Sequence, residues 1–216
     1  MNFKDLLFKL SSLDAVGSVT AASDFAYGIL SKYTTAEKMD NLTVIGFLDG
    51  KSDYTLMLDA HIDQIAMVVT DIDDNGFLTV SNAGGIDIRA LPSRTVTVHS
   101  KEKITAVFCA TPPHLASGEK EYTDVADIKL DTALGEKAKE IVSVGDYVTF
   151  NTEPFHLNKN LVCGRSFDDR AGAVCLLETA RRLSNAYLPV NVVFSFSTAE
   201  ELGCRGARTT TFKADP

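Results

Sequence analysis

The sequence predicts an α/β fold in which a mixed sheet is flanked by helices and interrupted by an inserted small β-barrel. Apolar residues recur at helical spacing toward both ends of the chain, next to short apolar runs typical of buried strands. The middle of the chain changes to short alternating strands separated by turn residues. We therefore expect a first α/β part (residues 1–67), an inserted domain (68–157) and a second α/β part (158–216) that is incomplete.

Composition narrows the classes of protein that the chain can belong to. Its 216 residues are 45% hydrophobic, enough for a substantial core. The net charge is −8 and no Lys/Arg cluster could follow a phosphate backbone, so nucleic acid is not an expected partner. No apolar run approaches the roughly 20 residues of a membrane span, and the first residues lack a signal-peptide core. We expect a cytoplasmic protein without a membrane partner.

The first α/β part is predicted to contain two helices followed by two strands. Apolar spacings of three and four over residues 3–10 and 21–30 predict amphipathic helices. The runs LTVIGFL and YTLMLDA, separated by the turn signal Asp49-Gly50, predict buried strands. The second run leads directly into His61.

A change in the spacing of apolar residues predicts where the insert and the second α/β part begin. GFLTV, RTVTVHS, ITAVF and DYVTF read as short strands of a barrel or sandwich. Helical spacing returns in DDRAGAVCLLETARRLSNA, and the run Val190–Phe196 then predicts a buried strand that ends just before two adjacent glutamates. The four cysteines are scattered without a C-x-x-C pair and predict neither a disulfide framework nor a structural zinc site.

Polar residues that directly follow buried strands are candidate site residues, because ligands of open α/β sheets bind beyond the carboxyl ends of the strands. His61 and Asp63 in DAHIDQIA fit this position. An imidazole can bind a metal through one nitrogen while a carboxylate fixes the other, which is the role expected for Asp63. A structural histidine in the core is the alternative.

Asp168 and Asp169 stand where the next helix begins. One aspartate suffices to cap a helix N-terminus, which is the structural explanation for such a residue. The second carboxylate is then free to coordinate a cation, and Asp168, on the strand side, is our candidate.

Glu200 and Glu201 follow the last predicted strand. They could form a solvated turn, but two adjacent carboxylates also suit a division of labour in which one binds a cation and the other moves a proton. His, Asp and Glu at three successive strand ends match zinc or cobalt chemistry. Together the three segments favour a metal site.

These motifs resemble those of the M42 family of metallo-aminopeptidases, which includes glutamyl and tetrahedral aminopeptidases, some of them labelled endoglucanases. DAHIDQIA is similar to the family's Ala-His-Met-Asp-Glu-Ile-Gly, FDDRAG to Asp-Asp/Asn-Arg-x-Gly and TAEELGCRGA to Glu-Glu-x-Gly-x-Arg-Gly-Ala. DIDDNGFLTV and VGDYVTF also look similar. The resemblance implies a zinc-peptidase-like (phosphorylase/hydrolase-like) sheet with a PDZ-like or barrel-like dimerisation insert.

The same resemblance implies a hydrolase that removes N-terminal residues from peptides with two divalent metal ions, zinc or cobalt. Asp168 would bridge the ions, His61 would hold one and Glu201 the other. Glu200 would be the general base, and Asp63 would support catalysis through His61. The resemblance also implies a cis peptide bond between Asp168 and Asp169, and a homo-oligomer built from dimers.

The sequence departs from the family pattern at several points. Gln64 stands where the family usually has Glu, and Ala66 where it usually has Gly. The family takes a further Asp and His ligand from strands that would follow Pro216, so we expect a truncated, weakened or inactive form. The alternative is a non-catalytic relative that keeps the fold for assembly. Action on glucan is less well supported, since adjacent glutamates do not flank a sugar at about 5–10 Å.

Overall fold

The computed structural model describes residues 2–112, 114 and 122–216, and the chain forms two compact units. The first unit combines Met1–Gln64 with Glu153–Pro216, and the second is Ile65–Thr152. The elements of the first unit are α1 (Phe3–Ser12), α2 (Ala21–Leu30), β1 (Thr35–Lys38), β2 (Val44–Leu48), β3 (Thr55–His61), β10 (Phe155–Asn158), β11 (Leu161–Cys163), α4 (Phe167–Leu183), β12 (Asn191–Ser197) and α5 (Arg205–Ala214).

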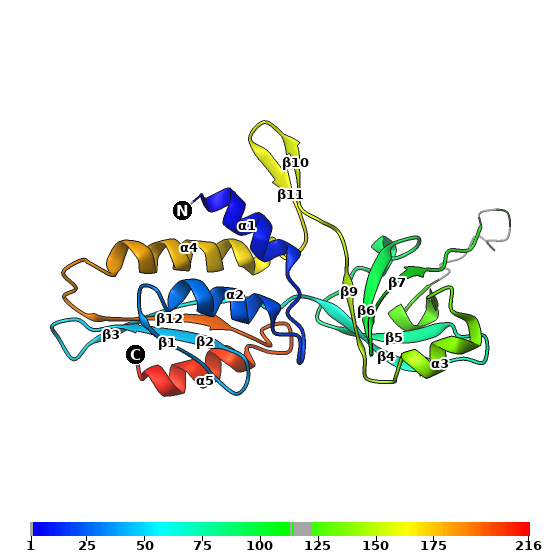
Figure 1. The fold of residues 1–216 in the computed structure, drawn as a ribbon, viewed down its shortest axis with the longest axis horizontal. Helices are drawn as coiled ribbons and strands as arrows, with labels where there is room; N and C mark the ends of the chain where they lie inside the picture. The colour runs from blue at the N-terminus through cyan, green and yellow to red at the C-terminus, as the bar shows by residue number, and fades with distance from the viewer. Residues whose placement is uncertain (1, 113, 115–121) are drawn as a thin grey trace. The chain divides into compact units, whose positions relative to one another are not determined.

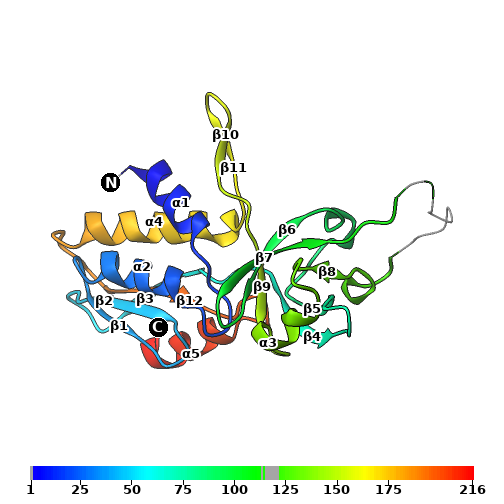
Figure 2. The ribbon, with the colours of Figure 1, turned by 45° about the vertical axis from the view of Figure 1, so that its right-hand side comes forward.

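The first unit contains a four-stranded mixed sheet in the order β1-β2-β12-β3. β12 runs antiparallel to β2 and parallel to β3. Helices α2 and α4 lie on one side of this sheet and α5 on the other, as both views show (Figures 1 and 2). The hairpin β10–β11 is a separate two-stranded sheet.

β12 is an inner strand of the sheet, and both of its faces are covered. The side chains of Val192, Phe194 and Phe196 belong to the core formed with α1, α2 and α4. On the opposite face the Ser195 hydroxyl bonds the hydroxyl of Thr210 on α5, at 3.0 Å. A strand buried on both faces reads as a continuous apolar run, which is how the sequence predicted it.

The second unit is a closed barrel in the order β4-β5-β8-β7-β6-β9. Its apolar core includes Met67, Val80, Val98 and Phe108. The elements are β4 (Ala66–Ile72), β5 (Leu78–Ala83), η1 (Ile88–Ala90), β6 (Thr95–His99), β7 (Lys103–Phe108), η2 (Val125–Asp127), β8 (Leu130–Asp131), η3 (Gly135–Lys137), α3 (Ala138–Ile141) and β9 (Tyr147–Phe150).

The mixed sheet flanked by helices and the closed barrel confirm the predicted fold class. The sequence did not predict β1 or the β10–β11 hairpin, whose residues are mostly exposed and carry no clear apolar alternation. In the described part of the chain, none of the helices combines the length and apolar character that crossing a bilayer requires.

The buried aromatic ring of Phe194 should contribute strongly to stability. Phe194 is 0% exposed, so replacement by alanine leaves a cavity at the centre of the sheet. We expect Phe194→Ala to lower the free energy of unfolding by about 3–5 kcal/mol, measured by urea denaturation. Phe212→Ala is the matched control, because that ring is 92% exposed and its loss should change stability by less than about 0.5 kcal/mol. Equal effects of the two substitutions would contradict this packing.

Candidate functional site

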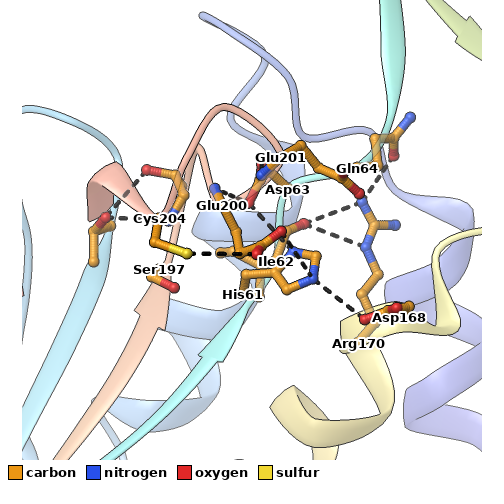
Figure 3. Close-up of polar contacts among 12 residues, drawn as sticks. His61, Ile62, Asp63, Gln64, Asp168, Arg170, Ser197, Glu200, Glu201 and Cys204 are labelled. Carbon is orange, nitrogen blue, oxygen red and sulfur yellow. Dashed lines mark hydrogen bonds and ion pairs between the residues drawn. The ribbon is translucent and has the colours of Figure 1, made fainter. Parts of the chain in front are cut away.

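The candidate site lies where β3 and β12 end. These strands pair in parallel register with Ser197 opposite His61, and the Ile62 amide donates to the Ser197 carbonyl at 2.9 Å. Both strands therefore release their following loops at the same edge of the sheet. This places the loop that begins at Ile62 beside the loop that carries Glu200 and Glu201 (Figure 3).

Asp63 ties these two loops together. Its Oδ1 accepts from the Glu200 amide at 3.2 Å and its Oδ2 accepts from the Glu201 amide at 3.3 Å. The same carboxylate lies beside the imidazole, with Oδ1 3.4 Å from His61 Nδ1. The Nδ1 atom is buried and, within the described residues, makes no well-directed hydrogen bond. Asp63 therefore acts on the backbone of the glutamate loop as well as on His61, which the sequence did not reveal.

Asp168 and Asp169 differ in their contacts at the start of α4. Both have non-helical backbone angles at the start of α4, and the peptide bond between them is cis, as the resemblance implied. The Gly172 amide donates to Asp169 Oδ1 at 3.1 Å, so Asp169 caps the helix. A Cβ at Gly172 would lie 2.5 Å from the Asp169 oxygens, so only glycine permits this approach. The Asp168 side chain is 98% exposed, with Oδ1 3.4 Å from His61 Nε2.

Glu200 reaches the same imidazole nitrogen from the other loop. Its Oε2 lies 3.9 Å from His61 Nε2, and the Cys204 thiol donates to its Oε1 at a sulfur–oxygen distance of 3.5 Å. Cys204 was not a predicted site residue. Its only sequence signal was its place within the TAEELGCRGA motif, four residues after Glu200.

The carboxylates set the protonation of the site. Burial lowers the pKa of His61, but the carboxylates of Asp63, Glu200 and Asp168 outweigh burial and raise that pKa to about 9. Burial raises the pKa of Glu201; His61 opposes this rise, and the neighbouring carboxylates add to it. Acidic side chains therefore crowd around a single imidazole, which favours a bound cation.

The donor atoms suit a divalent metal ion in chemistry and, for one pair, in spacing. Two ligands on a tetrahedral zinc ion are about 3.3–3.5 Å apart, given zinc bonds of about 2.0–2.2 Å. His61 Nε2 and Asp168 Oδ1 have a matching separation of 3.4 Å. Among residues 2–112, 114 and 122–216, no three His, Cys, Asp or Glu side chains are grouped so that they could hold an ion together. His61 and Asp168 therefore have the spacing of two neighbouring zinc ligands.

Arg170 supports the site through buried hydrogen bonds, and the sequence did not indicate this role. Arg170 is 0% exposed, and its guanidinium donates to backbone carbonyls at the end of α1 and just after β3. The acceptors are Leu10 at 2.6 Å, Ser11 at 3.3 Å, Leu13 at 2.5 Å and Ile62 at 3.3 Å, together with Gln64 Oε1 at 2.8 Å. Burial lowers the pKa of Arg170 to about 9, so the group stays charged at neutral pH. A signal existed: Arg170 precedes Ala173, Val174 and Leu177 at core spacing on α4.

Comparison with known proteins yields a match over most of the chain. The family model described as M42 glutamyl aminopeptidase matches residues 43–216. The glutamyl aminopeptidase of Lactococcus lactis subsp. cremoris is 28% identical over 170 residues, covering 74% of this chain and 48% of that protein. The lysyl aminopeptidase of Pyrococcus furiosus is 28% identical over 201 residues, covering 89% and 57%. The chain thus spans about half the length of these curated relatives.

Solved structures show the same fold. The Pyrococcus horikoshii TET1 peptidase, which can assemble into a tetrahedron or a large octahedral shell, superposes with a TM-score of 0.88 at 28% identity. The match covers 100% of this chain and 66% of that structure.

The raised pKa of His61 predicts a pH dependence of stability in metal-free protein. A group whose pKa rises from 6.5 to about 9 on folding stabilises the fold fully below pH 6.5 and loses this contribution as pH rises toward 9. We expect the free energy of unfolding in chelator to fall by an amount on the order of 3 kcal/mol over this range. His61→Gln should flatten the fall in urea denaturation at pH 6 and pH 9. An unchanged slope in His61→Gln would assign the dependence to other groups.

Proposed function

Because the chain belongs to the M42 glutamyl aminopeptidase family, we propose that it is a metal-dependent aminopeptidase that hydrolyses the first peptide bond of peptides. The observation that carries the proposal is the convergence of His61, Asp168 and Glu200, which come from three separate segments and meet at one imidazole nitrogen (Figure 3). The Lactococcus and Pyrococcus relatives, named as aminopeptidases, support the reaction class.

Each side chain has a distinct proposed task. His61, Asp168 and Glu201 would hold the divalent ions. When bound, zinc or cobalt ions would lower the pKa of water and polarise the peptide carbonyl. Glu200 would accept a proton from the attacking water and pass it to the leaving amine. Asp63 would keep His61 and the glutamate loop in place through the contacts described above.

The half-exposed carboxylate of Glu200 suits its proposed task better than the other acidic side chains do. Its side chain is 41% exposed, so it can reach a substrate, and its Oε1 accepts from Cys204 while its Oε2 faces His61. Asp63 is buried and fully engaged with backbone amides. Burial raises the pKa of Glu201. We therefore assign proton transfer to Glu200.

Removing the Glu200 carboxylate should abolish turnover while leaving the fold intact. We expect Glu200→Gln to lower kcat by about 10²–10⁴ on aminoacyl p-nitroanilides with added zinc or cobalt, with a much smaller effect on KM. Chelator should remove the activity of the parent protein. Glu178→Gln is the control, because Glu178 pairs with Arg181 and Arg182 on α4 and has no proposed task. Full activity in Glu200→Gln would reject this residue as the base.

We also propose that the protein forms a homo-oligomer through its barrel unit. The TET1 peptidase can assemble into a tetrahedron or a large octahedral shell, and the match covers 100% of this chain and 66% of that structure. Size-exclusion chromatography with light scattering should give a mass of at least twice the 23.4 kDa of the chain. A monomer would contradict the proposal. A large oligomer that neither binds metal nor cleaves peptides would favour the alternative function, that of a non-catalytic assembly protein.

A further inference from the structure

Gln64 occupies a buried position between two arginines that the proposed reaction does not use. Its side chain is 3% exposed, and its Oε1 accepts from Arg170 at 2.8 Å and from Arg165 at 3.3 Å. Guanidinium groups only donate, so the amide oxygen must face them and the orientation of the amide is fixed. Gln64 lies three residues after His61, in the loop that begins at Ile62 after β3 and is called the His61 loop below.

The two arginines are anchored to different parts of the chain. Arg170 belongs to α4, and its guanidinium also bonds carbonyls at the end of α1. Arg165 lies just before α4, pairs with Asp14 at 2.8 Å and donates to the Ser12 carbonyl at 2.9 Å. One amide oxygen therefore connects the His61 loop to the start of the helix that carries Asp168.

The charge balance of this cluster makes the shared acceptor important. Two guanidiniums lie close enough for Arg165 to lower the pKa of Arg170, and Asp14 forms an ion pair with Arg165. Arg165 Nε is buried and has no hydrogen-bond partner among the described residues. Losing the Gln64 oxygen would leave Arg170 Nη2 with only the Ile62 carbonyl and Arg165 Nη1 with only Asp14 as acceptors. One bond to each buried guanidinium would therefore be lost without replacement.

We propose that Gln64 is a positioning residue: its amide oxygen holds the loop from His61 to Gln64 against the start of α4 and thereby sets the spacing between His61 and Asp168. The inference rests on the proposed function, since that spacing matters only if a divalent cation binds there. A glutamate or glutamine can supply the oxygen, whereas an apolar side chain of the same size cannot. Gln64 acts through its neighbours and does not itself touch the cation.

Metal binding tests the proposal with two matched variants. Gln64→Leu removes the acceptor at similar size, and Gln64→Glu keeps it. Cobalt titration of the full chain, followed by calorimetry and visible absorption, should show about 10–100-fold weaker binding in Gln64→Leu, the range found for residues that orient metal ligands. Gln64→Glu should bind cobalt like the parent. Parent-like cobalt binding in Gln64→Leu would overturn the proposal.

A second measurement needs no metal and separates the proposal from the proposed function. The amides of Glu200 and Glu201 donate to Asp63, so they report on the position of the loop that Gln64 holds. In metal-free protein, hydrogen exchange of these amides should be faster in Gln64→Leu and unchanged in Gln64→Glu. Unchanged exchange in Gln64→Leu would overturn the positioning role. Absence of cobalt binding by the parent chain would instead reject the proposed function.

Two further variants keep the test decisive. Gln64→Ser also removes the amide but leaves room for water to bond the guanidiniums. This variant should therefore fold even if Gln64→Leu does not. It should show the same faster exchange, and parent-like exchange would overturn the proposal.

Thr210→Val removes a buried hydroxyl elsewhere in the unit, where Thr210 bonds Ser195. It should lower stability without changing cobalt binding or the exchange of Glu200 and Glu201.

Discussion

The parallel pairing of β3 with β12 is the constraint on which the site depends. Because Ser197 stands opposite His61, both strands end together and their loops start a few ångströms apart. The Asp63 carboxylate then bonds the Glu200 and Glu201 amides across the gap. A slip of one residue would move the imidazole to the other face of the sheet, since side chains alternate along a strand. Strand register thus decides which side chains meet.

A dense negative field follows from this convergence. The carboxylates of Asp63, Glu200 and Asp168 raise the pKa of His61 against the effect of burial, whereas burial and, to a smaller extent, the neighbouring carboxylates raise the pKa of Glu201. Like charges held together destabilise a fold unless a proton or a cation compensates them. A divalent cation would respond to the same field, but it would have to displace the proton from His61, so its binding would release that proton.

Arg170 keeps the segments of the site together through buried hydrogen bonds. A buried guanidinium is costly to desolvate, and the cost is offset here by carbonyls from the end of α1 and from Ile62. Those acceptors are far apart in the chain, so one side chain joins the N-terminal segment, the His61 loop and α4. The barrel unit has its own apolar core and closes its own sheet, so its fold requires none of these contacts.

The sequence by itself determined the α/β fold class, the barrel, the family and the short segments that bear His61, Asp168 and Glu200. These are local signals, because apolar period, turn residues and motif spacing are all written within a few residues. It also indicated that Asp169 caps the helix and Asp168 remains free, since one cap needs one carboxylate. Only the tertiary structure decided that Asp63 bonds the glutamate loop, that Cys204 donates to Glu200 and that Arg170 and Gln64 connect three segments. These contacts join residues up to 160 positions apart, or depend on the path of a loop, and neither is encoded in any local pattern.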